Sequence, residues 1–212
     1  MYINHFTLVA GPNGAGKSTL KDEFIRPGTD YFNGDIVFAH YANKYPHLSV
    51  EQLEGGVVST LEKLTNEAIE KRKDFAFETN FSSDMATNIT KKFKENNFTA
   101  NLIYIGIDSL NDCKSRITER IALGGHNVSD SQIEFNYHEG IKRVAENLSL
   151  FDNITFVDNM NIGKLKIVAL SKKGLVKSIL DENCKWFNSH FKSVFENLDI
   201  SQSEKRSNGF KL

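Results

Sequence analysis

Apolar residues along this chain fall into two patterns, short continuous runs and longer stretches with helical spacing. The runs His5–Ala10, Phe75–Phe77, Leu102–Ile107 and Asn153–Val157 are typical of buried strands. Helical spacing predicts helices over about 19–25, 36–42, 49–70, 82–95, 110–122 and 130–148. Because strands and helices alternate, we predict an α/β fold, a three-layer αβα sandwich with a mostly parallel sheet.

The C-terminal part of the chain has a different pattern. Lys164–Leu170 and Gly174–Val176 can form a small hairpin, and a last helix is expected over about Lys177–Phe195. No internal repeat, low-complexity segment or shift in composition marks a second domain. We therefore predict a single domain over residues 1–200, followed by a polar tail over 201–212.

The segment between the first strand and the first helix carries the clearest chemistry. Gly11 to Ser18 reads G-x-x-x-x-G-K-S, the phosphate-binding P-loop. Its glycines let successive main-chain N–H groups point at an anion, Lys17 adds a charge for the β- and γ-phosphates, and Ser18 offers a hydroxyl to Mg²⁺. The alternative is a glycine-rich turn that binds nothing, and the flanking strand and helix argue against it. The residues expected to bind nucleotide are Gly11, Pro12, Asn13, Gly14, Ala15, Gly16, Lys17, Ser18 and Thr19.

Two acidic positions are candidates for the acceptor side of a phosphoryl transfer. Asp35 lies at the end of a turn predicted over Phe32–Asp35, and it is either a general base for a hydroxyl or the N-cap of the next helix. Glu78 and Thr79 end the strand that begins at Phe75. Glu78 can bind Mg²⁺ or acceptor hydroxyls, or be an ordinary charge at a strand end. Ligands of parallel sheets sit beyond the carboxyl ends of the strands, where these residues are expected.

A pair of arginines predicts a helical lid over about residues 116–140. Arg116 and Arg120 lie one helical turn apart and share a face that points toward the hinge Gly124-Gly125. Such a pair can cover a transferring phosphoryl group as a lid closes, or can form a solvated face paired with nearby acids. His126, beside the hinge, can contact nucleotide or substrate, although a loop histidine is more often merely exposed.

Charge and cysteine content narrow the class of protein. The 212 residues carry a formal net charge of -1, so no basic field favours nucleic acid or a membrane surface. Two cysteines suggest reduced thiols rather than a disulfide framework. The apolar runs are shorter than the ~18 residues of a membrane span, and the chain enters its first strand at once. We expect a cytoplasmic protein without a membrane or nucleic-acid partner.

Several segments together resemble the zeta-toxin-like P-loop kinases, including their small bacterial members described as predicted ATPases or kinases. The P-loop is shared by many enzymes, whereas the Phe-Glu-Thr strand end and the Gly-Gly-His-Asn-Val segment are much more specific. The matching segments run in the family's order over about residues 5–160, and they are 10–20, 32–35, 75–79, 116–128 and 157–159. The resemblance implies a P-loop NTPase-type fold, ATP or GTP with Mg²⁺, and a hydroxyl-bearing acceptor. In the best-known relatives the acceptor is UDP-N-acetylglucosamine.

The resemblance also assigns roles to residues. Asp35 takes the position of the base, Lys17 and Ser18 hold nucleotide and metal, and Arg120 belongs to the lid. The resemblance places Glu78 and Thr79 on the substrate and metal side. Asn80, which follows them, and His126 complete the set of residues expected to bind substrate. Because relatives include toxins, an antitoxin-like protein partner is possible.

Two departures from the family pattern affect the acceptor and the rate. Relatives usually carry an arginine-rich run after the Gly-Gly-His segment, whereas Ile133–Tyr137 has no arginine, so Lys142 or Arg143 would have to supply that cation. Asn80 stands where the commoner sequence Glu-Thr-Thr has its second threonine. The sequence thus supports three hypotheses, namely a small-molecule kinase, a nucleotide switch or slow NTPase without an acceptor, and a scaffold that binds no nucleotide.

Overall fold

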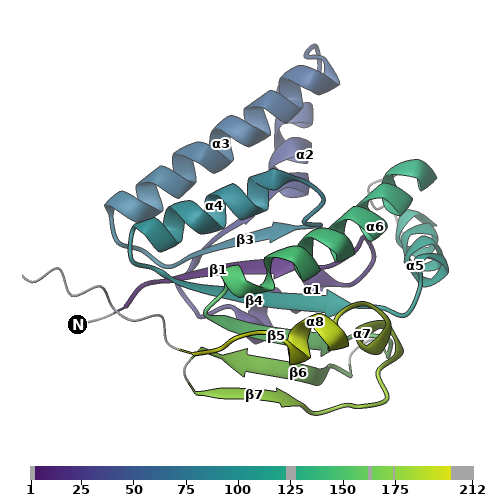
Figure 1. Cartoon of the computed structure of the whole chain (residues 1–212). Coiled ribbons are helices and arrows are strands. Elements are labelled where there is room, and N and C mark those ends of the chain that lie inside the picture. Colours follow the sequence, from purple (N-terminus) through teal and green to yellow (C-terminus); the bar gives the residue numbers. More distant parts are fainter. Residues whose placement is uncertain (1–2, 123–127, 162–163, 174, 202–212) are drawn as a thin grey trace, which may run out of the picture.

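The computed structural model describes residues 3–122, 128–161, 164–173 and 175–201, and a seven-stranded sheet forms its centre (Figure 1). The strands pair in the order β2-β3-β1-β4-β5-β6-β7. They are β1 His5–Ala10, β2 Asp30–Asn33, β3 Phe75–Thr79, β4 Thr99–Gly106, β5 Asn153–Asp158, β6 Lys166–Lys172 and β7 Val176–Ile179. The first five strands are parallel, whereas β6 and β7 are antiparallel to their neighbours. The predicted mostly parallel sheet is confirmed.

Helices cover the sheet unequally on its two faces (Figure 1). The described helices are α1 Lys17–Phe24, α2 Gly34–Lys44, α3 Val50–Glu70, α4 Asp84–Glu95, α5 Leu110–Ala122, α6 Asp130–Asn147, α7 Lys185–His190 and α8 Lys192–Glu196. One face packs against α3, α4, α6, α7 and α8 in a large aromatic core that includes Phe6, Phe93 and Trp186. The other face packs against α1 in a small cluster around Val9 and Ile105. The αβα sandwich is therefore thick on one side and thin on the other.

The alternation of residues along β1 explains how one strand serves both layers. Phe6 and Leu8 are fully buried in the aromatic core, while His5 and Thr7 on the opposite face are only half-buried. Side chains of a strand alternate between faces, so the sequence of β1 already separates a thickly covered face from a sparsely covered one.

Two segments differ from the sequence expectation. Residues predicted as a turn include Phe32 and Asn33, which end the edge strand β2. The strand β2 has only four residues, one of them an aspartate, so its sequence gives little indication of a strand. Pairing with β3 stabilises its extended conformation. The predicted helix over 177–195 is wrong, since this segment contains β7 and the two short helices α7 and α8. Its aromatic residues, spaced as in a helix, instead fill one core.

The hairpin of β6 and β7 predicted from the sequence is confirmed. The register of the parallel strands brings their carboxyl ends to one edge of the sheet, where Ala10 lies beside Thr79 and Asn33 beside Glu78. None of the described helices is long and apolar enough to cross a membrane.

Candidate active site

The P-loop occupies the carboxyl end of the central strand β1, and its backbone takes a conformation that only glycine supports easily. Gly11 has φ 148°, and a Cβ there would lie 2.2 Å from the carbonyl oxygen of Ile105 on β4. Gly16, with φ 91°, is the N-cap of α1 and turns the chain into the helix. These glycines therefore permit both the close approach to β4 and the turn that aims the helix N-terminus at the loop.

Lys17 begins α1 and is held by three oxygen atoms. Its Nζ donates to the carbonyl oxygens of Gly11 at 2.8 Å and Pro12 at 3.0 Å and to Oδ1 of Asn80 at 2.8 Å. Burial lowers the pKa of Lys17, while Glu78 and Asp35 act in the opposite direction. An ammonium group has three hydrogens, so these contacts use all of its donors. A bound phosphate would have to replace at least one of them.

A polar cluster beside the P-loop joins α1 to the ends of β2 and β3. Ser18 Oγ donates to Oε1 of Glu78 at 2.8 Å. Asn33 Nδ2 donates to Oε2 of Glu78 at 2.9 Å and to Ser18 Oγ at 3.1 Å, and the hydroxyl of Tyr31 also donates to Glu78. Burial, followed by the charge of Glu78, raises the pKa of Tyr31 well above its ordinary value. Tyr31 therefore stays protonated and remains a donor to the carboxylate at physiological pH.

Asp35 lies in the first turn of α2, immediately after this cluster. The N-cap is Asn33, whose Oδ1 accepts from the main-chain N–H groups of Asp35 at 2.9 Å and Ile36 at 3.3 Å. The interpretation of Asp35 as the N-cap is therefore wrong. The side chain of Asp35 is exposed and does not cap the helix. Its charge raises the pKa of Lys17, so Asp35 lies on the P-loop side of the sheet.

The two arginines predicted to belong to a lid lie in α5 and have different surroundings. Arg116 donates to the carbonyl oxygens of Asn159 at 2.7 Å, Met160 at 2.9 Å and Gly14 at 3.4 Å, so it ties the P-loop to the segment after β5. Arg120 is exposed, and its charge lowers the pKa of Lys17. His126 lies outside the described residues, as does the hinge at 124–125. Of the two arginines, Arg120 is the one whose charge acts on the P-loop lysine.

Helix α6 contacts the P-loop directly. Asn136 Nδ2 donates to Oδ1 of Asn13 at 2.9 Å, and Asn136 Oδ1 accepts from the hydroxyl of Ser82 at 2.8 Å. A Cβ at Gly140, one turn further on, would lie 2.3 Å from the carbonyl oxygen of Asn80. These contacts fix α6 to both the P-loop and the segment that follows β3.

The sequence did not point to several of these site residues. Tyr31 and Asn136 belong to no motif. Asn33 and Asn159 lie in the segments 32–35 and 157–159 that match the family, but no role was predicted for them. Asn159 Nδ2 donates to the carbonyl oxygen of Ala15 at 2.8 Å. Asn33 had a further usable signal, because asparagine two residues before an acidic first turn is a favoured N-cap. The predicted contacts Thr79 and Asn80 are already engaged, since Thr79 Oγ1 accepts from the main-chain N–H of Phe81 at 3.0 Å and Asn80 binds Lys17.

The P-loop lies at the end of the central strand, the polar cluster around Glu78 lies beside it, and α6 contacts it. Together these features define a P-loop kinase-like protein of the α/β class. Residues 5–165 match the family described as Zeta toxin. The chain belongs to the Zeta toxin family, and this membership supports a nucleotide-dependent, kinase-like function.

Individual relatives agree with this fold. A protein of Haemophilus influenzae, described as uncharacterized, is 27% identical over 134 residues, which are 63% of this chain and 93% of that protein. A structure from the PezAT chromosomal toxin–antitoxin system of Streptococcus pneumoniae is similar with a TM-score of 0.62 and 15% identity, covering 93% of this chain and 86% of that one. A complex of AvrRxo1-ORF1 and AvrRxo1-ORF2 with ATP has a TM-score of 0.63 at 12% identity, covering 89% and 63%. At these identities the solved structures support the fold.

Proposed function

We propose that this protein transfers the γ-phosphate of ATP or GTP to a hydroxyl group of a small molecule, with Asp35 as the base. The observation that supports this most is the convergence at one sheet edge. Lys17 and Ser18 begin α1, and Glu78 is the last residue but one of β3. Asp35 is the second residue of α2, and its charge acts on Lys17. Phosphoryl transfer needs a phosphate cradle, a metal, a cation and a base, and this edge offers candidates for each.

Ser18 and Glu78 are the residues proposed to hold Mg²⁺. Their oxygen atoms lie 2.8 Å apart, and hydroxyl and carboxylate oxygens are the ligands that Mg²⁺ prefers. Within the described ranges no group of three His, Cys, Asp or Glu side chains forms a metal site by itself. This pair suits an ion that takes its remaining ligands from nucleotide phosphates and water. The bound ion would neutralise charge on the phosphates.

The decisive experiment measures ADP or GDP release from the purified protein with Mg²⁺, each nucleotide, and a panel of sugars and nucleotide sugars that includes UDP-N-acetylglucosamine. We expect one acceptor class to raise release well above the rate without acceptor. Release that stays at background with every acceptor, while ATP binds, would contradict a small-molecule kinase.

A slow NTPase or nucleotide switch is the second candidate, and the absence of an arginine from Ile133–Tyr137 favours it. Arg143, one substitute for the missing arginine, pairs with Asp84 at 2.5 Å and Glu139 at 3.3 Å, and Arg116 is bound to carbonyls. Arg120 is the proposed cation for the phosphoryl group, because the resemblance assigns it to the lid and its charge acts on Lys17. A rate of nucleotide hydrolysis that no acceptor changes would favour this candidate.

A thermal shift with Mg-ATP tests the remaining scaffold hypothesis, since a protein that binds no nucleotide is not stabilised.

We also propose an antitoxin-like protein partner. The support is the structural neighbour from the PezAT toxin–antitoxin system, together with membership of the Zeta toxin family. Toxicity on induced expression in bacteria, relieved by a neighbouring gene product, is the measurement that tests it.

Asn80 is proposed to set the affinity for nucleotide by holding Lys17 in the ligand-free protein. Asn80→Ala removes one of the three acceptors of the ammonium, so Lys17 leaves its resting position more easily. We expect Mg-ATP to bind about tenfold more tightly, equivalent to about 1.4 kcal/mol. Isothermal titration calorimetry measures this change.

The matched control is Asn80→Asp, which puts a carboxylate beside the same ammonium. An ion pair holds Lys17 more firmly and the added charge repels phosphate, so the dissociation constant for Mg-ATP should rise at least tenfold, by roughly 1.4 kcal/mol or more. Equal affinities for the two variants would contradict the proposed role of Asn80.

A further inference from the structure

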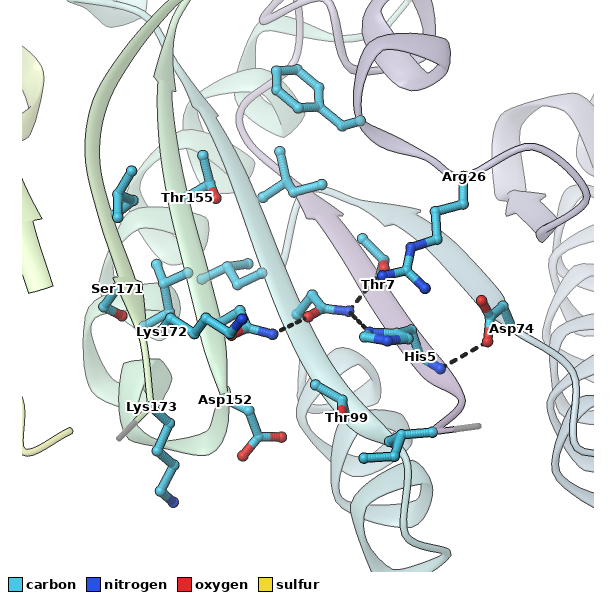
Figure 2. A pocket seen from close by; sticks show the side chains of 18 of the residues that line it. His5, Thr7, Arg26, Asp74, Thr99, Asp152, Thr155, Ser171, Lys172 and Lys173 are labelled. Atoms are coloured by element: carbon cyan, nitrogen blue, oxygen red, sulfur yellow. Dashed lines mark hydrogen bonds between the residues drawn. The ribbon is translucent and has the colours of Figure 1, made fainter. Parts of the chain in front are cut away.

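A cavity of about 970 Å³ lies on the thin face of the sheet, away from the P-loop (Figure 2). Its floor is formed by the first residues of β1, β4 and β5, and its walls by the end of α1 on one side and the end of β6 on the other. The cavity exists because α1 covers this face only as far as Phe24, while the C-terminal helices pack on the opposite face. No residue of the proposed active site lines it.

The floor of the cavity is a fixed row of polar side chains. Asn101 Nδ2 lies 3.3 Å from Nδ1 of His5 and 3.2 Å from Oγ1 of Thr7, and Asn101 Oδ1 accepts from Asn153 Nδ2 at 2.7 Å. These contacts link β1, β4 and β5 side by side (Figure 2). Polar groups in a row on a sheet face are unusual where a sandwich would normally place apolar residues against a helix. A polar ligand fits this floor better than a packing helix does.

Two cations reach this floor from opposite walls. Arg26 follows α1 and Lys172 ends β6, and both charges lower the pKa of His5, although burial contributes most. No residue in the described part of the chain forms an ion pair or side-chain hydrogen bond with either cation. Both are exposed and face a shared centre near His5 (Figure 2).

The acidic groups at the cavity are engaged with other partners. Asp152 pairs with Lys94 at 2.8 Å and accepts from the main-chain N–H of Ala100 at 2.9 Å. Asp74 accepts from the main-chain N–H of His5 at 2.9 Å, and it raises the pKa of that histidine. Arg26, Lys172 and Lys173 line the cavity together with Asp74 and Asp152, and Lys94 pairs with Asp152. The lining therefore keeps an excess of positive charge.

We propose that this cavity is a second ligand site, which binds an organic phosphate of nucleotide size between Arg26 and Lys172. The volume is at the upper end of the range of small-molecule sites and is far larger than a free phosphate ion needs. Phe24 and Leu170 supply apolar walls for a ring, and the two cations suit an anionic group. The eight residues of α1, about 12 Å of helix, separate this site from Lys17.

His5 reports on occupancy, because an anion between the two cations would reverse their effect on its imidazole. The experiment follows the imidazole resonances of His5 in the full-length protein by NMR, assigned through His5→Gln, during titration with AMP, adenosine or inorganic phosphate. We expect saturable shifts with AMP at submillimolar concentration and a higher pKa of His5 in the complex. Adenosine should give no shift, and inorganic phosphate should bind at least tenfold more weakly.

Variants separate this site from the P-loop. Arg26→Gln with Lys172→Gln should abolish the AMP-induced shift and raise the pKa of His5 in the free protein, since both side chains are exposed and their loss should not disturb the fold. Lys17→Ala should leave the AMP-induced shift unchanged. The proposal is overturned if AMP causes no saturable shift, if the double variant still responds, if Lys17→Ala abolishes the response, or if inorganic phosphate binds as tightly as AMP.

Discussion

Asp35→Asn is expected to lower acceptor-dependent phosphoryl transfer by about 10²–10⁴-fold, the usual contribution of a general base. The asparagine cannot take the proton of the acceptor hydroxyl, but it can occupy the same space. The cap of α2 should survive, because Asn33 accepts from the main-chain N–H of Asp35 and not from its side chain. Turnover should therefore fall without loss of the fold.

Two measurements on this variant distinguish a base from a structural carboxylate. The dissociation constant for Mg-ATP should change little, and the unfolding temperature should match that of the parent protein. Glu54→Gln removes an exposed carboxylate from α3 and serves as the matched control, with turnover unchanged. If Asp35→Asn retains full acceptor-dependent turnover, Asp35 is not the base.

Trp186→Ala is expected to lower the free energy of unfolding by about 3–5 kcal/mol, as for other large aromatic residues in cores. Trp186 is only 2% exposed and packs against Tyr104 and Phe156. Its indole lies so close to Gly106 that a Cβ there would be 2.3 Å from the ring. For a chain of this size the loss corresponds to a fall in Tm of roughly 6–20 °C. Denaturant titration and calorimetry measure both quantities.

Two companion variants show which feature of the tryptophan matters. Trp186→Phe keeps most of the ring but loses the hydrogen bond from Nε1 to Oδ1 of Asp158, 2.8 Å long, and should cost less than half as much. Gly106→Ala forces the new methyl group against the indole and should destabilise the protein even though no buried side chain is removed. A Gly106→Ala protein as stable as the parent would contradict this packing.

The elements with strong local patterns could be predicted, and the weak ones could not. The long helix α3 has a capping box in which Ser49 and Gln52 bond to each other's main chain, and this sequence signal marks its start. The strand β2 and the short helices α7 and α8 are too short for their patterns to be read. Their conformation depends on β3 and on the aromatic core, which lie far away in the sequence.

The sequence by itself determined the P-loop, the mostly parallel sheet and the family, because a glycine pattern, buried strand runs and short motifs are local properties. The tertiary structure alone decided which side chains meet. It placed Asn33 opposite Glu78 through strand register, bound Arg116 to main-chain carbonyls, and brought Asn80 to Lys17 across 63 positions. It also left one face of the sheet thinly covered, with Arg26 and Lys172 on opposite sides of a polar floor. Such contacts depend on the distance between strands and helices in space, and spacing along the chain carries no information about that distance.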